Sequence, residues 1–156
     1  MPLSCGQVGR NALRAARFAA RRPRSALVLT RMAFWVAALS VLVRFLPIRR
    51  ALSLLTPRRR PTKTPAAGGD EVQRRLAGLL DLLLAADFWV FTPLCWKRAP
   101  VLHRFLALEG IQTRVVFGVR KGAGEELDGH AWLEAGGEPV LEKTPPDYKV
   151  TFSHPT

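Results

Sequence analysis

Charge divides this chain into two parts and limits what each part can fold into. The first acidic residue is Asp70, whereas residues 1–66 contain 14 of the 24 Lys and Arg residues. Residues 67–156 hold the other 10 basic residues together with all 12 acidic ones, a net charge of −2. The first part cannot neutralise its own charge, while the second has the balance of an ordinary folded domain. At 156 residues, we expect one folded domain with an extension.

The basic part has two stretches with the pattern of helices. Residues 10–22 place arginines at spacings of three and four, which predicts a helix with a cationic stripe. Residues 26–46 are the most apolar stretch, but only twelve residues separate Arg31 from Arg44. A membrane-spanning helix needs about 20 predominantly apolar residues. We therefore expect residues 26–46 to pack on the protein core, with a helix lying in a membrane interface or crossing the bilayer as the alternatives.

Composition also indicates where one region ends and the next begins. Residues 57–69 contain three prolines and two glycines without periodicity, which is typical of a linker. We therefore assign residues 1–56 to a basic amphipathic helical region and residues 70–156 to a folded domain. The only cysteines are Cys5 and Cys95, which makes a disulfide framework improbable and favours a reducing, cytoplasmic location.

The folded domain has the pattern of an α+β protein. Leucines at three- and four-residue spacing predict a helix from Asp70 to about Asp87. Thr92-Pro93 is a typical helix start, and Gly110 is a typical end, so a second helix is expected between them. Alternating apolar residues then predict strands at 113–120, 130–134 and 139–142.

Two residues in this domain have the chemistry of a nucleophile and a base. Cys95 falls in the first turn of the second helix, where unpaired backbone N–H groups stabilise a thiolate. His130 begins a strand after a glycine-containing loop, from where its ring can reach the helix N-terminus. One Cys and one His do not by themselves specify an enzyme, because buried cysteines and structural histidines are common. The alternative is a non-catalytic membrane-surface or scaffold protein that acts through its basic part.

A third group is needed to orient the imidazole, and the choice depends on the hairpin after His130. A loop of Gly136-Gly137 alone would put Lys143 opposite His130 and turn Glu142 to the other face. A three-residue loop at 135–137 would put Glu142 directly opposite His130. We choose the three-residue loop because it supplies the acid. Should the carboxylate of Glu142 point away, the role passes to whichever other acid lies closer, with these candidates: Asp128, Glu134, Glu138 and Asp147.

The segment from Cys95 to Glu134 resembles a known family of peptidases. It matches, in order, a Cys at a helix start, Gly110-Ile111, Gly118-Val119-Arg120 and His-Ala-Trp-Leu-Glu at 130–134. This pattern is similar to the transglutaminase-like cysteine protease domain of the lasso-peptide biosynthesis B proteins, over residues of about 90 to 152. In that family the Cys is the nucleophile, the His is the base, and an Asp a dozen residues later is the third member. Glu142 occupies that last position here.

The resemblance implies a fold, an activity and partners. The expected fold is a papain- or transglutaminase-like core, in which a Cys-bearing helix packs on a small antiparallel sheet that bears the His. The expected activity is removal of the leader from a ribosomally made precursor peptide during lasso-peptide maturation. The N-terminal region resembles the helical region of stand-alone members and shows no winged recognition module. A separate leader-recognition protein and a cyclase are therefore expected partners.

The remaining expectations concern ligands. No cofactor is expected, and no metal, since the chain lacks the paired Cys or His spacing of a tetrahedral site. The cluster Arg58-Arg59-Arg60 is read as a solvated one, so no nucleic-acid partner is expected. We expect the basic part to associate with an anionic membrane surface, because basic side chains are attracted to anionic lipids.

Overall fold

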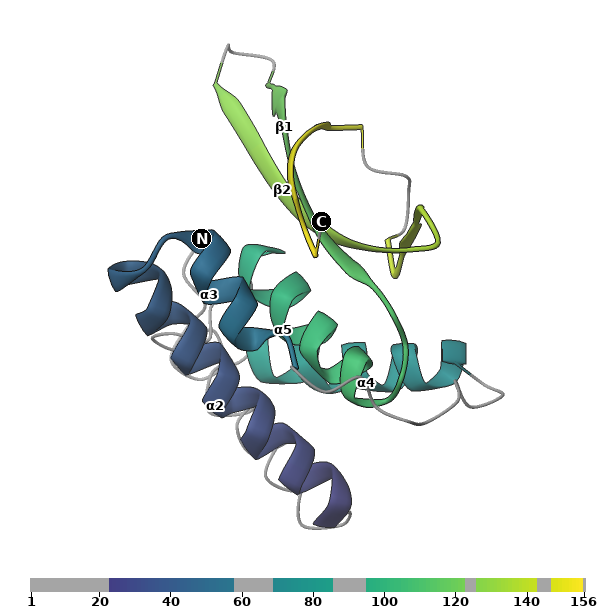
Figure 1. Cartoon of the computed structure of the whole chain (residues 1–156). Helices are drawn as coiled ribbons and strands as arrows, with labels where there is room; N and C mark the ends of the chain where they lie inside the picture. The colour runs from purple at the N-terminus through teal and green to yellow at the C-terminus, as the bar shows by residue number, and fades with distance from the viewer. Residues whose placement is uncertain (1–22, 58–68, 86–94, 123–125, 143–146, 156) are drawn as a thin grey trace.

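The computed structural model of the chain describes residues 23–57, 69–85, 95–122, 126–142 and 147–155. Within them it contains four helices and a four-stranded sheet (Figure 1). The helix predicted at residues 10–22, most of the predicted linker and the Thr92-Pro93 helix start lie outside the described residues. In chain order the elements are α2 (Pro23–Phe45), α3 (Ile48–Leu55), α4 (Gly69–Leu84), α5 (Cys95–Leu108), β1 (Arg114–Lys121), β2 (Leu127–Ala135), β3 (Glu138–Val140) and β4 (Lys149–His154).

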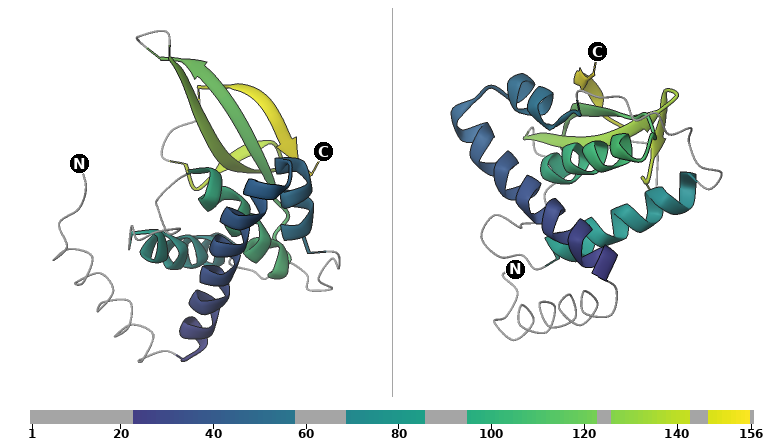
Figure 2. Two further views of the ribbon diagram at one scale, coloured as in Figure 1. Left: turned by 90° about the vertical axis from the view of Figure 1, so that its left-hand side faces the viewer. Right: turned by 60° about the horizontal axis from the view of Figure 1, so that its bottom comes forward.

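The sheet forms one layer and helices α2, α3 and α4 form the other, with α5 between the two. The strands are antiparallel in the order β3-β2-β1-β4. Helix α5 packs against β1 and β2 on one side and against α2, α3 and α4 on the other, as the two views of Figure 2 show. The predicted α+β fold, with a Cys-bearing helix packed on a small antiparallel sheet, is confirmed.

The apolar stretch of the basic part packs on the core along one face. Its buried residues follow the helical spacing of three and four that puts side chains on one side of a helix. Three of them have no solvent exposure, and all belong to the same core cluster as residues of α5, β1 and β2: Leu29, Met32, Val36 and Leu39. The expected packing of residues 26–46 on the core is therefore present on that face.

Helix α5 ends as the sequence predicts. Gly110 has a φ of 83°. Its N–H donates to the carbonyl of Ala107, and the N–H of Ile111 donates to that of Leu106. This pair of bonds is the Schellman arrangement, which satisfies the last carbonyls of a helix and favours glycine at the left-handed position. The turn directs the chain from α5 straight into β1.

The hairpin between β2 and β3 corrects the predicted loop. Ala135 pairs with Glu138, so the loop is Gly136-Gly137 alone, and the choice of a three-residue loop was wrong. The two glycines have φ values of 62° and 92°, as a type I′ turn requires. This turn matches the twist of the flanking strands, which is why two-residue loops of this type predominate. Strand β3 then ends at Val140, two residues before the predicted end.

The C-terminal segment adds a strand that the sequence did not predict. Strand β4 pairs with β1 at the edge opposite to β3. Phe117 and Phe152 stack across this pair with ring centroids 5.8 Å apart. The register shifts between Phe117 and Gly118. Tyr148, the residue just before β4, lies beside His130, which matters for the site below.

Candidate active site

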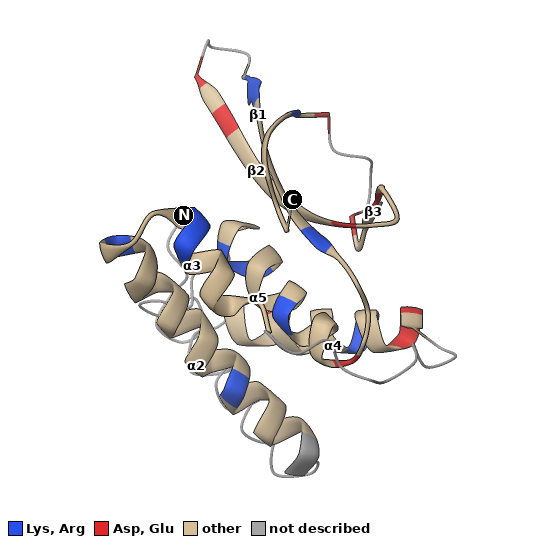
Figure 3. Ribbon diagram, in the orientation of Figure 1, with Lys and Arg blue, Asp and Glu red and all other residues tan. Residues whose placement is uncertain are grey.

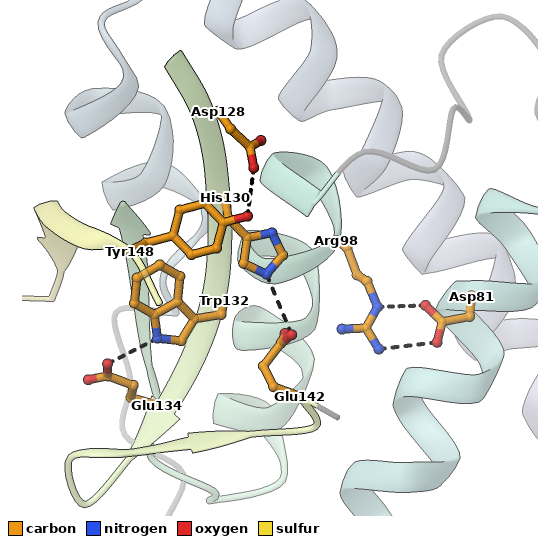
Figure 4. A network of polar contacts seen from close by, with 8 residues as sticks. All are labelled: Asp81, Arg98, Asp128, His130, Trp132, Glu134, Glu142 and Tyr148. Carbon is orange, nitrogen blue, oxygen red and sulfur yellow. Dashed lines mark hydrogen bonds and ion pairs between the residues drawn. The ribbon is translucent and has the colours of Figure 1, made fainter. Parts of the chain in front are cut away.

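Alternate residues of β2 form one polar face of the sheet. Side chains alternate between the two faces of a strand. Ala131 and Leu133 point into the core. The residues between and beside them take the opposite face, and every one of them makes a polar or ring contact there (Figure 4): Asp128, His130, Trp132 and Glu134.

Glu142 lies beside His130 despite the shorter loop. Its Oε2 is 3.5 Å from Nε2 of His130, and the two side chains are 21% and 27% exposed. With the two-glycine loop, regular alternation would have sent Glu142 to the other face. Alternation stops after Val140, because Leu141 has a left-handed φ of 62° and turns the chain. Glu142 thus reaches His130 from beyond the end of the strand and not from across the ladder.

The other candidate acids have partners of their own. Glu134 accepts a hydrogen bond from Nε1 of Trp132 at 3.0 Å and forms an ion pair with Arg114 at 2.7 Å. Asp128 accepts from Tyr148 and from Arg120, both at 2.9 Å. Of the carboxylates in the described residues, only Glu142 forms an ion pair with His130. The contact to Nε2 leaves Nδ1 as the ring nitrogen available to a thiol.

Two aromatic side chains hold the ring of His130. Trp132 lies nearly parallel to it, with ring centroids 6.0 Å apart. The ring of Tyr148, from the segment before β4, is 5.3 Å away. The Tyr148 hydroxyl donates to Asp128, and the guanidinium of Arg120 lies 4.5 Å from the Tyr148 ring. This ring packing limits how far the imidazole can rotate.

The tyrosine and its acid influence each other's ionisation. The hydrogen bond from Tyr148, followed by that from Arg120, lowers the pKa of Asp128. The same bond, followed by burial, raises the pKa of Tyr148, and a negative charge on Cys95 adds a smaller contribution in the same direction. The phenol is therefore a neutral donor near neutral pH.

Cys95 is the first residue of α5 and its thiol is free and half-buried. Its helix packs directly on the strand that carries His130. No hydrogen bond joins Cys95 to His130, both of which lie in the described part of the chain. Hydrogen bonds between a nucleophile and its base are often looser without substrate and tighten when substrate binds. The structure thus joins Glu142 to His130 and places Cys95 at the first residue of the helix that packs on β2.

A cation one helical turn after Cys95 faces the site. Arg98 donates to both carboxylate oxygens of Asp81 on α4, at 2.6 and 3.1 Å. In Figure 4 its guanidinium lies between Asp81 and Glu142. The pKa of Arg98 is raised chiefly by its bond to Asp81, and the charge of Glu142 contributes further. Arg98 therefore adds positive charge on the side of Glu142 that faces α4.

Sequence reasoning missed Arg98 and Tyr148, gave Asp128 only as a substitute for Glu142, and included Trp132 only as part of the family motif. Asp128 was read as part of a solvated loop, because β2 begins three residues earlier than predicted. Had the strand been started at Leu127, alternation would have put Asp128, His130 and Trp132 on one face. Tyr148 carries no such local signal. Among the described residues, no group of His, Cys, Asp and Glu could hold a metal ion.

Comparison with known proteins supports the fold. A family model described as transglutaminase-like superfamily matches residues 35–153, from the middle of α2 almost to the end of β4. The match assigns no narrower family. No curated protein and no solved structure is significantly similar to the chain.

Proposed function

The chain belongs to the transglutaminase-like superfamily, whose members are typically Cys-His hydrolases, and we propose that it is a cysteine peptidase. Cys95 is the nucleophile, His130 is the base and Glu142 orients the base. The observation that carries this proposal is the 3.5 Å contact between Glu142 and Nε2 of His130, on a sheet packed against the helix that begins with Cys95.

The arrangement supports the following chemistry. Nδ1 of His130 takes the thiol proton, and Sγ of Cys95 attacks the carbonyl carbon of the scissile peptide. Backbone N–H groups in the first turn of α5 stabilise the oxyanion of the tetrahedral intermediate. His130 then gives its proton to the leaving amine, which produces a thioester. Water hydrolyses the thioester with His130 again as base, and Glu142 stabilises the imidazolium in both halves of the reaction.

The substrate that we propose is the leader of a ribosomally made precursor peptide, in the cytoplasm. This rests on the resemblance of Cys95, Gly110-Ile111 and residues 130–134 to the lasso-peptide leader peptidases. The same resemblance implies two partners, namely a separate protein that presents the leader and a cyclase that acts on the released core peptide. A short precursor reading frame beside this one, together with those two proteins, would support the assignment.

Thiol labelling tests the nucleophile without knowledge of the substrate. The full chain is treated with iodoacetamide at pH 7, and modification of Cys95 and Cys5 is followed by mass spectrometry. We expect Cys95 to react faster than it does in the unfolded chain, and His130→Ala to slow it, because the thiolate then loses its base. Cys5→Ala is the matched control and leaves the rate at Cys95 unchanged. Labelling of Cys95 at the rate of the unfolded chain in both backgrounds contradicts the proposal.

Cleavage tests the enzyme itself. Precursor peptide and recognition partner are incubated with the chain, and the products are identified by mass. Cys95→Ala and His130→Ala should each abolish cleavage while the circular dichroism spectrum is retained, because each side chain takes part in bond making or proton transfer. Cleavage that persists in both variants removes the mechanism.

A further inference from the structure

The exposed apolar side chains of the molecule gather on its N-terminal helices. Eight large hydrophobic residues in the described part of the chain are exposed, and six of them lie on α2 and α3. The other two, Leu127 and Val150, lie on strands. Single exposed apolar residues are normal, but a concentration of them indicates an interaction surface. On α2 they form what we call the outer stripe, made up of Leu27 (63% exposed), Phe34 (63%), Val41 (55%) and Phe45 (77%).

The outer stripe lies on the side of α2 opposite to the core. Leu27, Phe34 and Val41 are seven residues apart, which puts them on one line along a helix, whereas Met32 and Val36 on the other side have no exposure. The most apolar 18-residue window of the segment Ser25–Phe45 has a mean hydropathy of 2.1, yet only 22% of that window is buried. A helix that is apolar all round is normally buried in protein or lipid. Here protein covers one side only.

The charges around the outer stripe indicate what covers the other side. Helices α2 and α3 contain no acidic residue (Figure 3). Four of their arginines are exposed, and none forms an ion pair in the described part of the chain: Arg31, Arg44, Arg49 and Arg50. A second copy of the chain would bring the same arginines against each other. An anionic lipid surface offers both an apolar layer for the stripe and negative charge for the arginines.

Packing decides between lying on the bilayer and crossing it. A spanning α2 would have to leave α3, α4 and α5 and expose Met32, Val36 and Leu39, which are fully buried among them. It would also carry Arg31 into the hydrocarbon, which is unfavourable. We propose that α2 and α3 dock in the plane of an anionic membrane, with the outer stripe at the boundary of headgroups and acyl chains. Because α5 separates α2 from the sheet, a docked molecule keeps the His130 face away from the membrane.

Vesicle sedimentation with the full chain tests this surface. We expect binding to vesicles that contain phosphatidylglycerol, weaker binding as salt is raised, and little binding to phosphatidylcholine alone. Phe34→Ser combined with Val41→Ser should lower partitioning by about tenfold or more, because two apolar side chains no longer enter the interface. Leu127→Ser combined with Val150→Ser is the matched control, with equally exposed residues on the sheet, and should leave partitioning unchanged. Arg44→Gln and Arg50→Gln should each lower it by about fivefold.

Each other result overturns the proposal in a distinct way. Unchanged partitioning in the Phe34/Val41 variant shows that the stripe is not the docking surface. A chain that self-associates through the stripe and does not bind the anionic vesicles has a second copy as its partner. Binding that resists both high salt and an alkaline wash shows a spanning helix. The cleavage reaction plays no part in these measurements, so the proposal stands or falls independently of the proposed function.

Discussion

The edge and the faces of the His130 ring make different kinds of contact. At its edge, Glu142 approaches Nε2 and compensates the positive charge that forms when the ring takes a proton. On its faces, Trp132 and Tyr148 restrict rotation without taking up either nitrogen. Charge compensation and ring placement can therefore be removed separately, which gives two predictions at the scale of single residues.

The first prediction concerns the charge of Glu142. Glu142→Gln keeps the size of the side chain and removes its charge, so the cleavage rate should fall by about two to four orders of magnitude with little change in KM. Glu142→Asp restores the charge and should recover much of the rate. Glu138→Gln, an exposed acid on the same hairpin, is the control and should be silent. Equal rates for Gln and Glu at position 142 would show that the contact is not catalytic.

The second prediction concerns the ring of Tyr148. Tyr148→Phe keeps the packing against His130 and loses only the bond to Asp128, so kcat/KM should fall by less than threefold, a loss on the order of 0.5 kcal/mol. Tyr148→Ala removes the packing, and misplacement of a catalytic group by about 1 Å can cost a hundredfold. The measurement is kcat/KM for cleavage by each of the two variants. If Phe is as damaging as Ala, the hydroxyl and not the ring is what matters.

At the scale of elements, the hairpin shows what sequence reasoning could and could not reach. Gly-Gly between two strands is a sufficient signal for a two-residue turn with two positive φ values, and that rule was set aside in favour of the acid. The acid nevertheless reached His130, because Leu141 takes a left-handed φ of 62°. A leucine rarely does so, and nothing in the neighbouring sequence announces it. The rule that successive side chains point to opposite faces holds only as far as the strand itself continues.

Long-range pairing explains the strand that was missed. The fold class, the end of α5 at Gly110 and strands β1 and β2 follow from local patterns of caps and alternation. Strand β4 is six residues long and pairs with β1, more than 30 residues earlier in the chain. Val150, Thr151 and Phe152 are compatible with a strand, but so short a run does not reveal its partner, and Phe117, which stacks on Phe152, lies far away in the chain. Tyr148 enters the site only because β4 pairs there.

The third prediction concerns Gly118, where the strand leaves room for this packing. A Cβ at Gly118 would lie 2.7 Å from Cβ of Tyr148 and 2.9 Å from the ring of Trp132. Gly118→Ala should therefore lower the free energy of unfolding by about 1–3 kcal/mol, the usual cost of overpacking, and displace Tyr148 from His130. Gly129→Ala on β2 is the control, since a Cβ there meets nothing within 4 Å. Urea denaturation measures both; equal stability of the two variants would contradict the expected collision.

At the scale of the whole molecule, α2, α3 and the residue after α3 make contacts with both α5 and the sheet. The guanidinium of Arg104 on α5 lies 3.8 Å from the centre of the Trp35 ring on α2 and donates to the carbonyl of Leu55 at the end of α3. The hydroxyl of Thr56, next in the chain, is hydrogen-bonded to Nε2 of His154 on β4 at 2.9 Å. The family match begins at residue 35, inside α2. Docking through α2 would thus hold the entire described fold at the membrane.

His103 lies in the interior where these layers meet. Its side chain is buried, with Nδ1 hydrogen-bonded to the Thr113 hydroxyl at 2.9 Å and Nε2 without a partner among the described residues. The ring of His154 is 6.5 Å away. Burial, followed by the charge of His154, lowers the pKa of His103 to about 4, although a hydrogen bond with the backbone of Thr113 acts in the opposite direction. A protonated ring carries an N–H on both nitrogens, and the one at Nε2 has no acceptor in the described part of the chain, so the folded protein keeps this ring neutral.

The last prediction follows from the lowered pKa of His103, which exists only in the folded chain. Unfolding restores an ordinary histidine pKa of about 6.5, so between pH 6.5 and 4 the unfolded chain binds a proton that the folded chain does not. The titration of His103 should therefore lower the free energy of unfolding by at most about 1.4 kcal/mol for each unit that the pH falls below 6.5. Above pH 7 His103 causes no such loss of stability, because the ring is neutral in both the folded and the unfolded chain. His103→Gln removes the titration and leaves the carboxylates untouched, so the difference between the two pH profiles isolates His103. Denaturation at pH 7 and pH 4.5 gives the comparison. Parallel profiles would mean that the ring is accessible to protons in the folded protein.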